Sequence, residues 1–282
     1  MNSPTPSIHQ ETGVNPETSV SFSDKFKRAW PGGYFEGNPL DPMAPSSYGV
    51  LGYNSILYTV YLACIKHYVN PATTVLEIGP GRGAWTKTFL QRDCKKVYAV
   101  DAAPAEHTGF WDYVGPTDRA EYIASGELTL SEVPDDSIDY FFSFGVFCHL
   151  KPEMCETYLI SLAKKMRVGS HAFLMIADYD KYNACMDRAD QLSIERFFAS
   201  RKVWLAARLA SSLSRKLFRS KAALRRVSKT DDLDLSRDAG GANWYHWGLD
   251  RACAAIRQQG FQIVERDTEV VARDPVIHFA KL

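Results

Sequence analysis

The segment Val75-Leu76-Glu77-Ile78-Gly79-Pro80-Gly81-Arg82-Gly83 decides the fold class. Its apolar start, preceded by Thr74, is typical of a buried strand, and a helical pattern continues from Ala84 to Gln91. Because glycine has no side chain, the turn between them lets the backbone approach a bound molecule closely. The sequence therefore predicts a strand, a glycine loop and a helix whose amino terminus faces a ligand with negative charge.

The alternation of strands and helices continues beyond this segment. We predict further strands at Lys96 to Val100, Glu121 to Ala124, Ile138 to Phe144 and His171 to Ala177, and helices at Ser55 to Tyr68 and at Pro152 to about Met166. Strands that alternate with helices imply a parallel sheet that is covered on both faces.

The last part of the sequence has a different pattern. A helix from about Trp247 to Gln259 precedes two strands, Phe261 to Val271 and Pro275 to Leu282, joined by a short turn at Arg273-Asp274. So short a connection requires antiparallel strands. We therefore expect an α/β fold with a Rossmann-like, mostly parallel seven-stranded sheet, helices on both faces, a C-terminal antiparallel hairpin and a helical insertion.

Composition and length indicate a globular protein. The 282 residues are 45% hydrophobic and 23% charged, which suits neither a disordered chain nor a membrane bundle. The cysteines lack any CxxC pair, which argues against a zinc ribbon or a disulfide scaffold. No secretory pattern is visible, so we expect a cytoplasmic protein.

The domain organisation follows from local composition. Residues 1–24 are rich in Ser, Thr, Pro and Asn and are expected to form a disordered tail, and residues 25–282 are expected to form one domain with a helical basic insertion at about 180–243. The segment Trp30 to Tyr53 is dense in Gly, Pro and aromatic residues. It either packs against the core or forms a lid over an active site.

Two ligand classes compete for the glycine loop. Asp101 ends the second strand, where its carboxylate could accept hydrogen bonds from ribose hydroxyls. The spacing Gly79-x-Gly81-x-x-Ala84 also satisfies the relaxed dinucleotide fingerprint, so a nicotinamide or flavin cofactor remains an alternative. Glu77, inside the first strand, favours a ligand that carries a cation, because a buried acid needs a partner.

These residues resemble the motifs of class I S-adenosylmethionine-dependent methyltransferases, over roughly Val75 to Asp178. The glycine segment resembles the motif that wraps the methionine part of S-adenosylmethionine, Asp101 resembles the acid that binds the ribose, and Ser125-Gly126-Glu127 is similar to the segment that meets the adenine amine. The segment Pro134 to Ser143 resembles the signature of the fourth strand. The cofactor-binding residues that the resemblance implies are Glu77, Gly79, Pro80, Gly81, Gly83, Asp101, Ala102, Glu127, Leu128, Ser143 and Phe144.

Two histidines are candidates for a general base. His149 follows the fourth strand, where sheets of this type gather ligands, and His246 lies in Asn243-Trp244-Tyr245-His246-Trp247. His149 could instead only pack or cap the next helix, and His246 could belong to a packed aromatic corner. Asp178 suits either substrate binding or an N-cap.

A metal is not expected. Asp178, Asp180 and Asn183 could in principle hold magnesium, but carboxylates near a turn are usually solvated.

The insertion carries a strong positive charge. Eleven Lys or Arg residues and no acid lie between Arg196 and Thr230, with apolar residues mostly four apart, which predicts a basic amphipathic helix. The segment 196–229 could attract an anionic or lipid-linked acceptor, lie on a membrane surface or contact nucleic acid, or it could be a solvated cap. No nucleic acid partner is expected, because no Asn-Pro-Pro-Tyr-type pocket follows the fourth strand.

The sequence therefore predicts methyl transfer from S-adenosylmethionine to a hydroxyl of a small molecule or sugar. A non-catalytic nucleotide-binding or membrane-surface module and a nicotinamide-dependent oxidoreductase are the alternatives.

Overall fold

The computed structural model describes residues 40, 56–190, 233–234 and 243–282. The expected tail at residues 1–24, the aromatic segment 30–53 except Leu40, and the basic segment 196–229 lie outside the described residues. No helix within these described ranges is long and apolar enough to cross a membrane.

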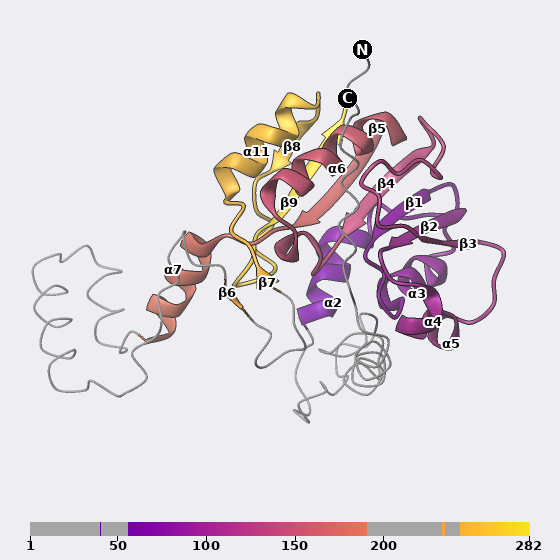
Figure 1. The fold of residues 1–282 in the computed structure, drawn as a ribbon, viewed down its shortest axis with the longest axis horizontal. Coiled ribbons are helices and arrows are strands. Elements are labelled where there is room, and N and C mark those ends of the chain that lie inside the picture. Colours follow the sequence, from indigo (N-terminus) through magenta and orange to yellow (C-terminus); the bar gives the residue numbers. More distant parts are fainter. Residues whose placement is uncertain (1–39, 41–55, 191–232, 235–242) are drawn as a thin grey trace, which may run out of the picture.

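A seven-stranded sheet with the order β3-β2-β1-β4-β5-β9-β8 forms the centre of the molecule (Figure 1). The strands are β1 Thr74–Ile78, β2 Lys96–Asp101, β3 Ala120–Ala124, β4 Ile138–Ser143, β5 Met166–Met175, β8 Gln262–Glu265 and β9 Val276–Lys281. The first five run parallel, and β9 is antiparallel to both β5 and β8. The predicted mostly parallel sheet with a C-terminal antiparallel hairpin is confirmed.

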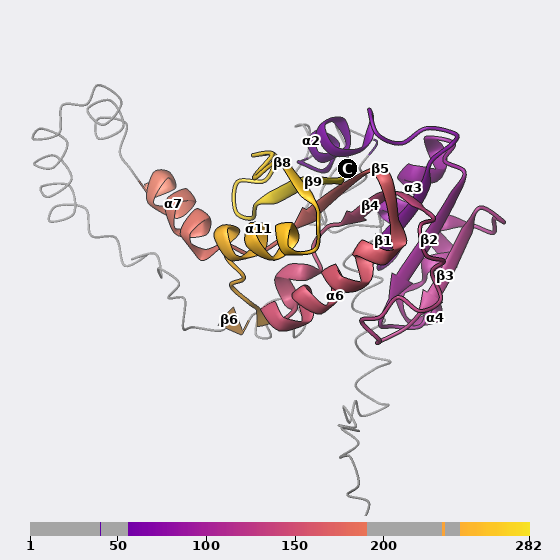
Figure 2. The same ribbon diagram turned by 90° about the horizontal axis from the view of Figure 1, so that it is seen from above.

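Helices cover both faces of this sheet (Figure 2). The helical elements are α2 Ile56–Val60, η1 Tyr61–Ile65, α3 Ala84–Gln91, α4 Ala105–Thr108, α5 Phe110–Val114, η2 Phe147–His149, α6 Pro152–Lys165, α7 Tyr179–Asp190 and α11 Leu249–Gln258. Strands β6 Leu233–Asp234 and β7 Asn243–Trp244 form a separate two-stranded sheet. Helices α2, α3 and α5 contribute to the core on one face, and α6 and α11 to the core on the other.

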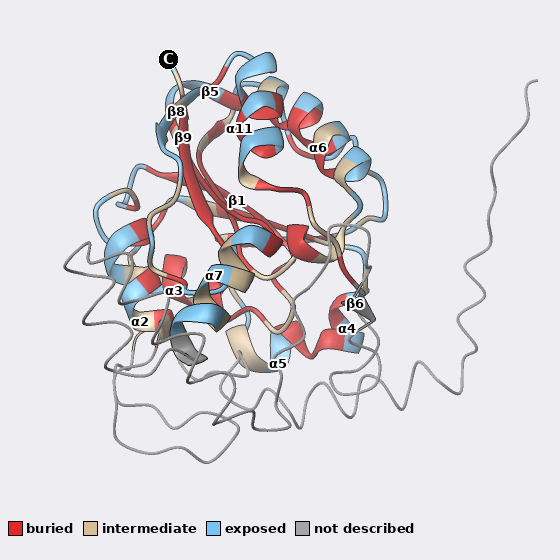
Figure 3. Cartoon of the chain, turned by 90° about the vertical axis from the view of Figure 1, so that its left-hand side faces the viewer, coloured by how far each residue is buried: buried red, intermediate tan, exposed pale blue. Residues whose placement is uncertain are grey.

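The alternation of side chains along each strand produces these two cores. In β1, Val75 packs on the side of α3, whereas Leu76 and Ile78 pack on the side of α6 and α11. All five residues of β1 are buried, as expected for a central parallel strand (Figure 3).

Three elements differ most from the prediction. The expected helix from Ser55 to Tyr68 contains a π-helical turn, η1, in which Lys66 N–H donates to the carbonyl of Tyr61. Strand β5 begins at Met166 rather than His171, because Met166 already pairs with Ile138.

Strand β8 is also shorter than predicted, since it ends at Glu265 rather than Val271. The Asp267 carboxylate accepts hydrogen bonds from the backbone amides of Glu269 and Val276. Glu269 has φ +56°, so the chain turns here and the strand ladder stops.

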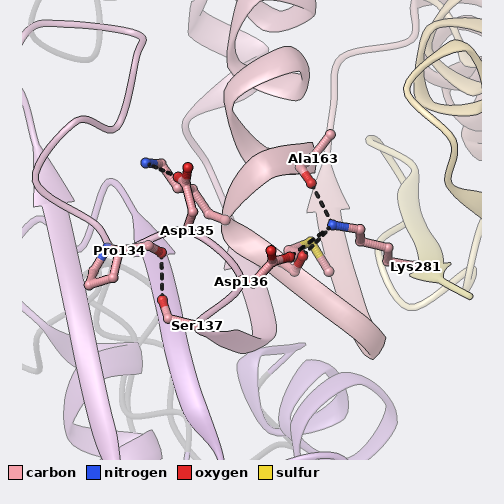
Figure 4. Close-up of polar contacts among 8 residues, drawn as sticks. Pro134, Asp135, Asp136, Ser137, Ala163 and Lys281 are labelled. Carbon is pink, nitrogen blue, oxygen red and sulfur yellow. Dashed lines mark hydrogen bonds and ion pairs between the residues drawn. The ribbon is translucent and has the colours of Figure 1, made fainter.

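The segment before β4 is tied to α6 and to β9 (Figure 4). Its contacts are Ser137 Oγ to Pro134 O (2.7 Å), Lys165 Nζ to Asp135 Oδ1 (2.6 Å), and Lys281 Nζ to Asp136 Oδ1 (3.4 Å), Ala163 O (2.7 Å) and Met166 O (2.6 Å). These contacts join the start of β4 to α6 and to β9. The polar residues of this motif therefore have a structural role in the described chain.

Candidate active site

The glycine loop connects β1 to α3 through left-handed backbone conformations. Gly79, Gly81 and Gly83 have φ values of +74°, +52° and +93°. Gly79 N–H donates to the carbonyl of Val100 at 2.8 Å, and Gly83 N–H donates to that of Pro80 at 2.7 Å. These φ values favour glycine, because an L side chain is strained there.

Close packing restricts the same loop to glycine. A Cβ atom on Gly79 would lie 2.0 Å from Val146 Cγ2, and one on Gly83 would lie 2.4 Å from Val114 Cγ2. Val146 lies between β4 and η2, so the turn after β4 is packed directly on the glycine loop.

Asp101 lies against the glycine loop at the end of β2. Its Oδ2 accepts a hydrogen bond from Gly81 N–H at 3.1 Å, and its Oδ1 accepts one from Ala103 N–H at 2.9 Å. Burial raises the pKa of the Asp101 carboxyl, and these backbone hydrogen bonds oppose that shift. The structure thus brings the glycine loop and Asp101 together, with Ala102 exposed beside them.

Glu77 is buried beneath the loop with one carboxylate oxygen unsatisfied. Only 1% of its surface is exposed, and its Oε2 accepts a hydrogen bond from Thr86 Oγ1 at 2.5 Å. Within the described chain no donor reaches Oε1. Burial raises the pKa of Glu77 to about 8. A buried acceptor without a donor suits a ligand that brings a cationic group.

The end of β3 lies on the other side of Asp101. Ser125 N–H donates to the Asp101 carbonyl at 2.8 Å, and Thr129 Oγ1 donates to Glu127 Oε2 at 3.2 Å. Glu127 is exposed, whereas Leu128 packs against the core. A small pocket next to these residues is lined by Val100, Ile123, Ser125, Leu130, Ser131, Glu132 and Val133.

Ser143 and Phe144 close the end of β4. The Ser143 hydroxyl donates to the Ile78 carbonyl at 2.9 Å and so ties β4 to β1. The ring of Phe144 lies 5.4 Å from that of Trp85 and is largely buried. In this structure Ser143 joins β4 to β1, and Phe144 packs against Trp85 of α3.

His149 ends η2 at the carboxyl edge of the sheet. Its backbone N–H donates to the carbonyl of Val146 at 2.8 Å, and its side chain is partly exposed. Because Val146 packs on Gly79, the turn that carries His149 is anchored to the glycine loop.

His246 has a structural contact through its ring. Its Nδ1 accepts a hydrogen bond from Tyr179 N–H at 3.1 Å, and its ring lies 4.9 Å from that of Tyr179. A neutral imidazole with Nδ1 as acceptor carries its proton on Nε2. This geometry favours the packed aromatic corner over a general base.

Asp178 caps two helices at once. Its Oδ1 accepts hydrogen bonds from Asp180 and Lys181 N–H at 2.8 and 3.1 Å, at the start of α7. Its Oδ2 accepts one from Leu249 N–H at 2.7 Å, at the start of α11. Of the two roles considered for Asp178, the structure therefore shows the N-cap. Among the described residues, no group of three side chains could hold a metal ion.

Residues 76–174 match the family model described as a methyltransferase domain. These residues therefore form a methyltransferase domain, and the solved structures described below share its fold. S-adenosylmethionine is therefore its cofactor, and the dehydrogenase and non-catalytic alternatives are set aside. No curated protein matches the sequence.

Solved structures share this fold at low identity. One is a methyltransferase in complex with the Trm112 methyltransferase activator of Haloferax volcanii, with TM-score 0.53 and 11% identity over 94% of this chain and 97% of that one. Another, a Mesorhizobium loti S-adenosylmethionine-dependent methyltransferase, has TM-score 0.53 and 12% identity over 80% and 98%. The Burkholderia thailandensis 1,6-didemethyltoxoflavin-N1-methyltransferase, solved with that compound and S-adenosylhomocysteine, has TM-score 0.50 and 14% identity over 100% and 93%.

The sequence did not single out one charged cluster of this methyltransferase. Asp274, expected only in a hairpin turn, is fully buried, and its Oδ2 accepts from Arg273 Nε at 2.6 Å. Arg273 lies over the ring of Trp244 at 5.2 Å. Lys181 pairs with Asp267 at 2.5 Å nearby. No sequence pattern marked this cluster, because its members come from distant segments.

Proposed function

We propose that this methyltransferase transfers the methyl group of S-adenosylmethionine to a hydroxyl of a small molecule or sugar, with His149 as general base. The observation that carries the proposal is the packing of Val146 on Gly79, which anchors the turn of His149 to the glycine loop. This arrangement supports a base beside the methyl donor. The competing role for His149 is to pack or cap the adjoining helix.

The described contacts support a specific placement of the cofactor. We place the methionine moiety on Gly79, Pro80, Gly81 and Gly83, with its ammonium toward the buried carboxylate of Glu77. Asp101 and Ala102 are proposed to hold the ribose, and Glu127 and Leu128 the adenine. Ser143 and Phe144 bound the site at the end of β4.

The chemistry requires little from the protein beyond positioning. S-adenosylmethionine supplies an activated methyl group, so holding the acceptor in line can contribute about 7–11 kcal/mol. The acceptor oxygen forms a bond to the methyl carbon as the carbon–sulfur bond breaks. The hydroxyl proton passes to a ring nitrogen of His149.

The acceptor class is inferred from the chain outside the described residues. The basic segment 196–229 would attract an anionic or lipid-linked acceptor and could contact a membrane surface peripherally. A small-molecule acceptor is in keeping with the Burkholderia enzyme of similar fold, which was solved with a bound small molecule. We propose a cytoplasmic location, and we do not propose a nucleic acid partner.

The experiment is a methyl-transfer assay against a panel of hydroxylated sugars, phosphosugars and phenols, with S-adenosylhomocysteine and methylated product measured by mass spectrometry. His149→Gln should lower kcat about 10²- to 10⁴-fold and leave the affinity for S-adenosylmethionine unchanged. His246→Gln is the matched control. Product methylated only at nitrogen, or equal activity of the His149 variant, would refute the proposal.

A further inference from the structure

Asp274 and His149 both lie at the carboxyl ends of the parallel strands. It precedes Pro275, which opens the approach to β9, and the first residue of β9, Val276, pairs with Met175 at the end of β5. The Pro275 carbonyl accepts a hydrogen bond from Ile176 N–H at 3.0 Å. Because β9 runs antiparallel, its beginning meets the carboxyl ends of β4 and β5.

The Asp274 carboxylate is buried but only half satisfied. None of its surface is exposed. Its Oδ2 accepts from Arg273 Nε at 2.6 Å and lies 2.5 Å from the Nη2 atom of Arg273. No donor in the described ranges reaches Oδ1. Burying an acceptor without a donor costs free energy. This oxygen therefore indicates a hydrogen-bond donor that reaches it in another conformation of the site.

The groups around Asp274 come from its own turn and from two other elements. Strand β7 brings η2 beside this turn, because Tyr245 N–H donates to the Cys148 carbonyl at 2.8 Å and Arg273 lies over the ring of Trp244 at 5.2 Å. The groups whose charges act on Asp274 are Arg273, His149 of η2 and Lys181 of α7, and Cys148 of η2 is its other neighbour. Lys181 Nζ is directed to Asp267 Oδ2 at 2.5 Å and to the backbone carbonyl of Asp274 at 3.5 Å. Arg273 contacts Oδ2. Of these groups, Cys148 is only a weak donor, so the imidazole of His149 is the group best suited to serve Oδ1.

We propose that Asp274 is a positioning residue that acts through His149. An N–H of the imidazole donates to Asp274 Oδ1, which fixes the tautomer and directs the lone pair of the other ring nitrogen toward the acceptor hydroxyl. When that nitrogen takes the proton, the ionised Asp274 stabilises the imidazolium and itself stays unprotonated. This inference rests on the proposed function only for the role of His149 as base.

The first test reads the ring of His149 directly. Protein labelled with ¹⁵N-histidine and saturated with S-adenosylhomocysteine is compared as wild type and as Asp274→Asn, with His149→Gln to assign the signals. We expect one ring tautomer of His149 in the wild type and the other tautomer, or a mixture, in Asp274→Asn. Identical ring signals in the two folded proteins would overturn the proposal.

Asp139→Asn is the matched control. Asp139 is a partly buried carboxylate at the opposite edge, where it accepts from Thr74 N–H at 2.7 Å and pairs with Arg167 at 3.1 Å. Its substitution should leave the His149 ring signals unchanged. A change equal to that in Asp274→Asn would show a global effect and refute the specific coupling.

A second test does not depend on the folding of an Asp274 variant. Burial raises the pKa of Asp274, and Arg273 and, to a smaller extent, His149 oppose this rise. The ¹³C carboxyl signal of Asp274 should therefore titrate at higher pH in His149→Gln than in the wild type. An unchanged titration would overturn the proposal. Neither test requires turnover, so coupling without O-methylated product would refute the proposed function and leave this inference standing.

Discussion

The two halves of the sheet position their polar groups in different ways. In the half made by β1, β2 and β3, Glu77 binds Thr86 nine residues away, and Asp101 binds Gly81 twenty residues away. In the half made by β4, β5, β8 and β9, Asp178 binds Leu249 across 71 residues, and His171 contacts His278 across 107. The first half is therefore organised by local sequence, and the second by tertiary contacts.

The largest expected effect is on the local half, at Gly79. Gly79→Ala combines a left-handed backbone with a Cβ 2.0 Å from Val146 Cγ2. We expect about 4 kcal/mol lower unfolding free energy and about a hundredfold weaker binding of S-adenosylmethionine, equivalent to about 3 kcal/mol. Denaturant unfolding and calorimetric titration measure both.

Gly115→Ala is the matched control for strain alone. Gly115 has φ +84°, and nothing lies within 4 Å of the position that a Cβ atom would take there. We expect a cost of about 1–2 kcal/mol and unchanged cofactor affinity. If the two variants bound S-adenosylmethionine equally, close packing of the loop would be irrelevant to the site.

The next effect is the pH dependence that Glu77 gives to the unliganded protein. Its pKa rises from an ordinary value of 4.5 to about 8 on folding, so the folded state holds the proton more tightly. Stability should fall as pH rises from about 4.5 to 8, by up to about 5 kcal/mol. Glu77→Gln should remove this fall, whereas exposed Glu106→Gln should keep it. A wild-type stability profile that stays flat across this window contradicts the buried, protonated carboxyl.

In the second half of the sheet, substitution of Asp178 should lower the unfolding free energy by a smaller amount, through two helices at once. Asp178→Ala removes the caps of α7 and α11 together, and each cap is worth about 1 kcal/mol, so the unfolding free energy should fall by about 2 kcal/mol. Hydrogen exchange should quicken at the first turns of both helices. Exposed Asp118→Ala should change neither quantity. Faster exchange in α7 alone would show that the bond to Leu249 contributes nothing.

The smallest effect is expected at the histidine pair between β5 and β9. His171 Nδ1 lies 3.0 Å from His278 Nε2, and His278 is stacked on Phe173 at 4.2 Å. Burial lowers the pKa of His278 from 6.5 to about 4. The contribution of neutral His278 to the free energy of unfolding is therefore complete above pH 6.5. It is lost as pH falls toward 4, by about 1–2 kcal/mol.

Urea unfolding of wild type and His278→Gln between pH 7 and pH 4 measures this contribution. The variant should lose less stability than the wild type over that interval, and His67→Gln, at an exposed position, should follow the wild type. Parallel curves for the wild type and His278→Gln would show that the histidine pair does not couple folding to pH.

Prediction from the sequence succeeded where a signal was local. The strand at Thr74–Ile78 and the helix at Ala84–Gln91 have the predicted bounds, because period and glycine placement define both. The prediction was wrong for the strand that ends at Glu265. The Asp267 carboxylate ends the strand ladder through hydrogen bonds that cannot be inferred from the periodicity of the sequence. The competing roles of Asp178 also stayed open until Leu249 was seen beside it.

The sequence by itself determined the seven strands of the main sheet, the turn of glycines and the acid that follows it, because each is set by a local pattern of residues. Tertiary structure alone decided which nitrogen of His246 is engaged and that Asp274 is buried. These contacts join segments that are far apart in the sequence and meet only in the folded chain. A local sequence pattern therefore cannot reveal them.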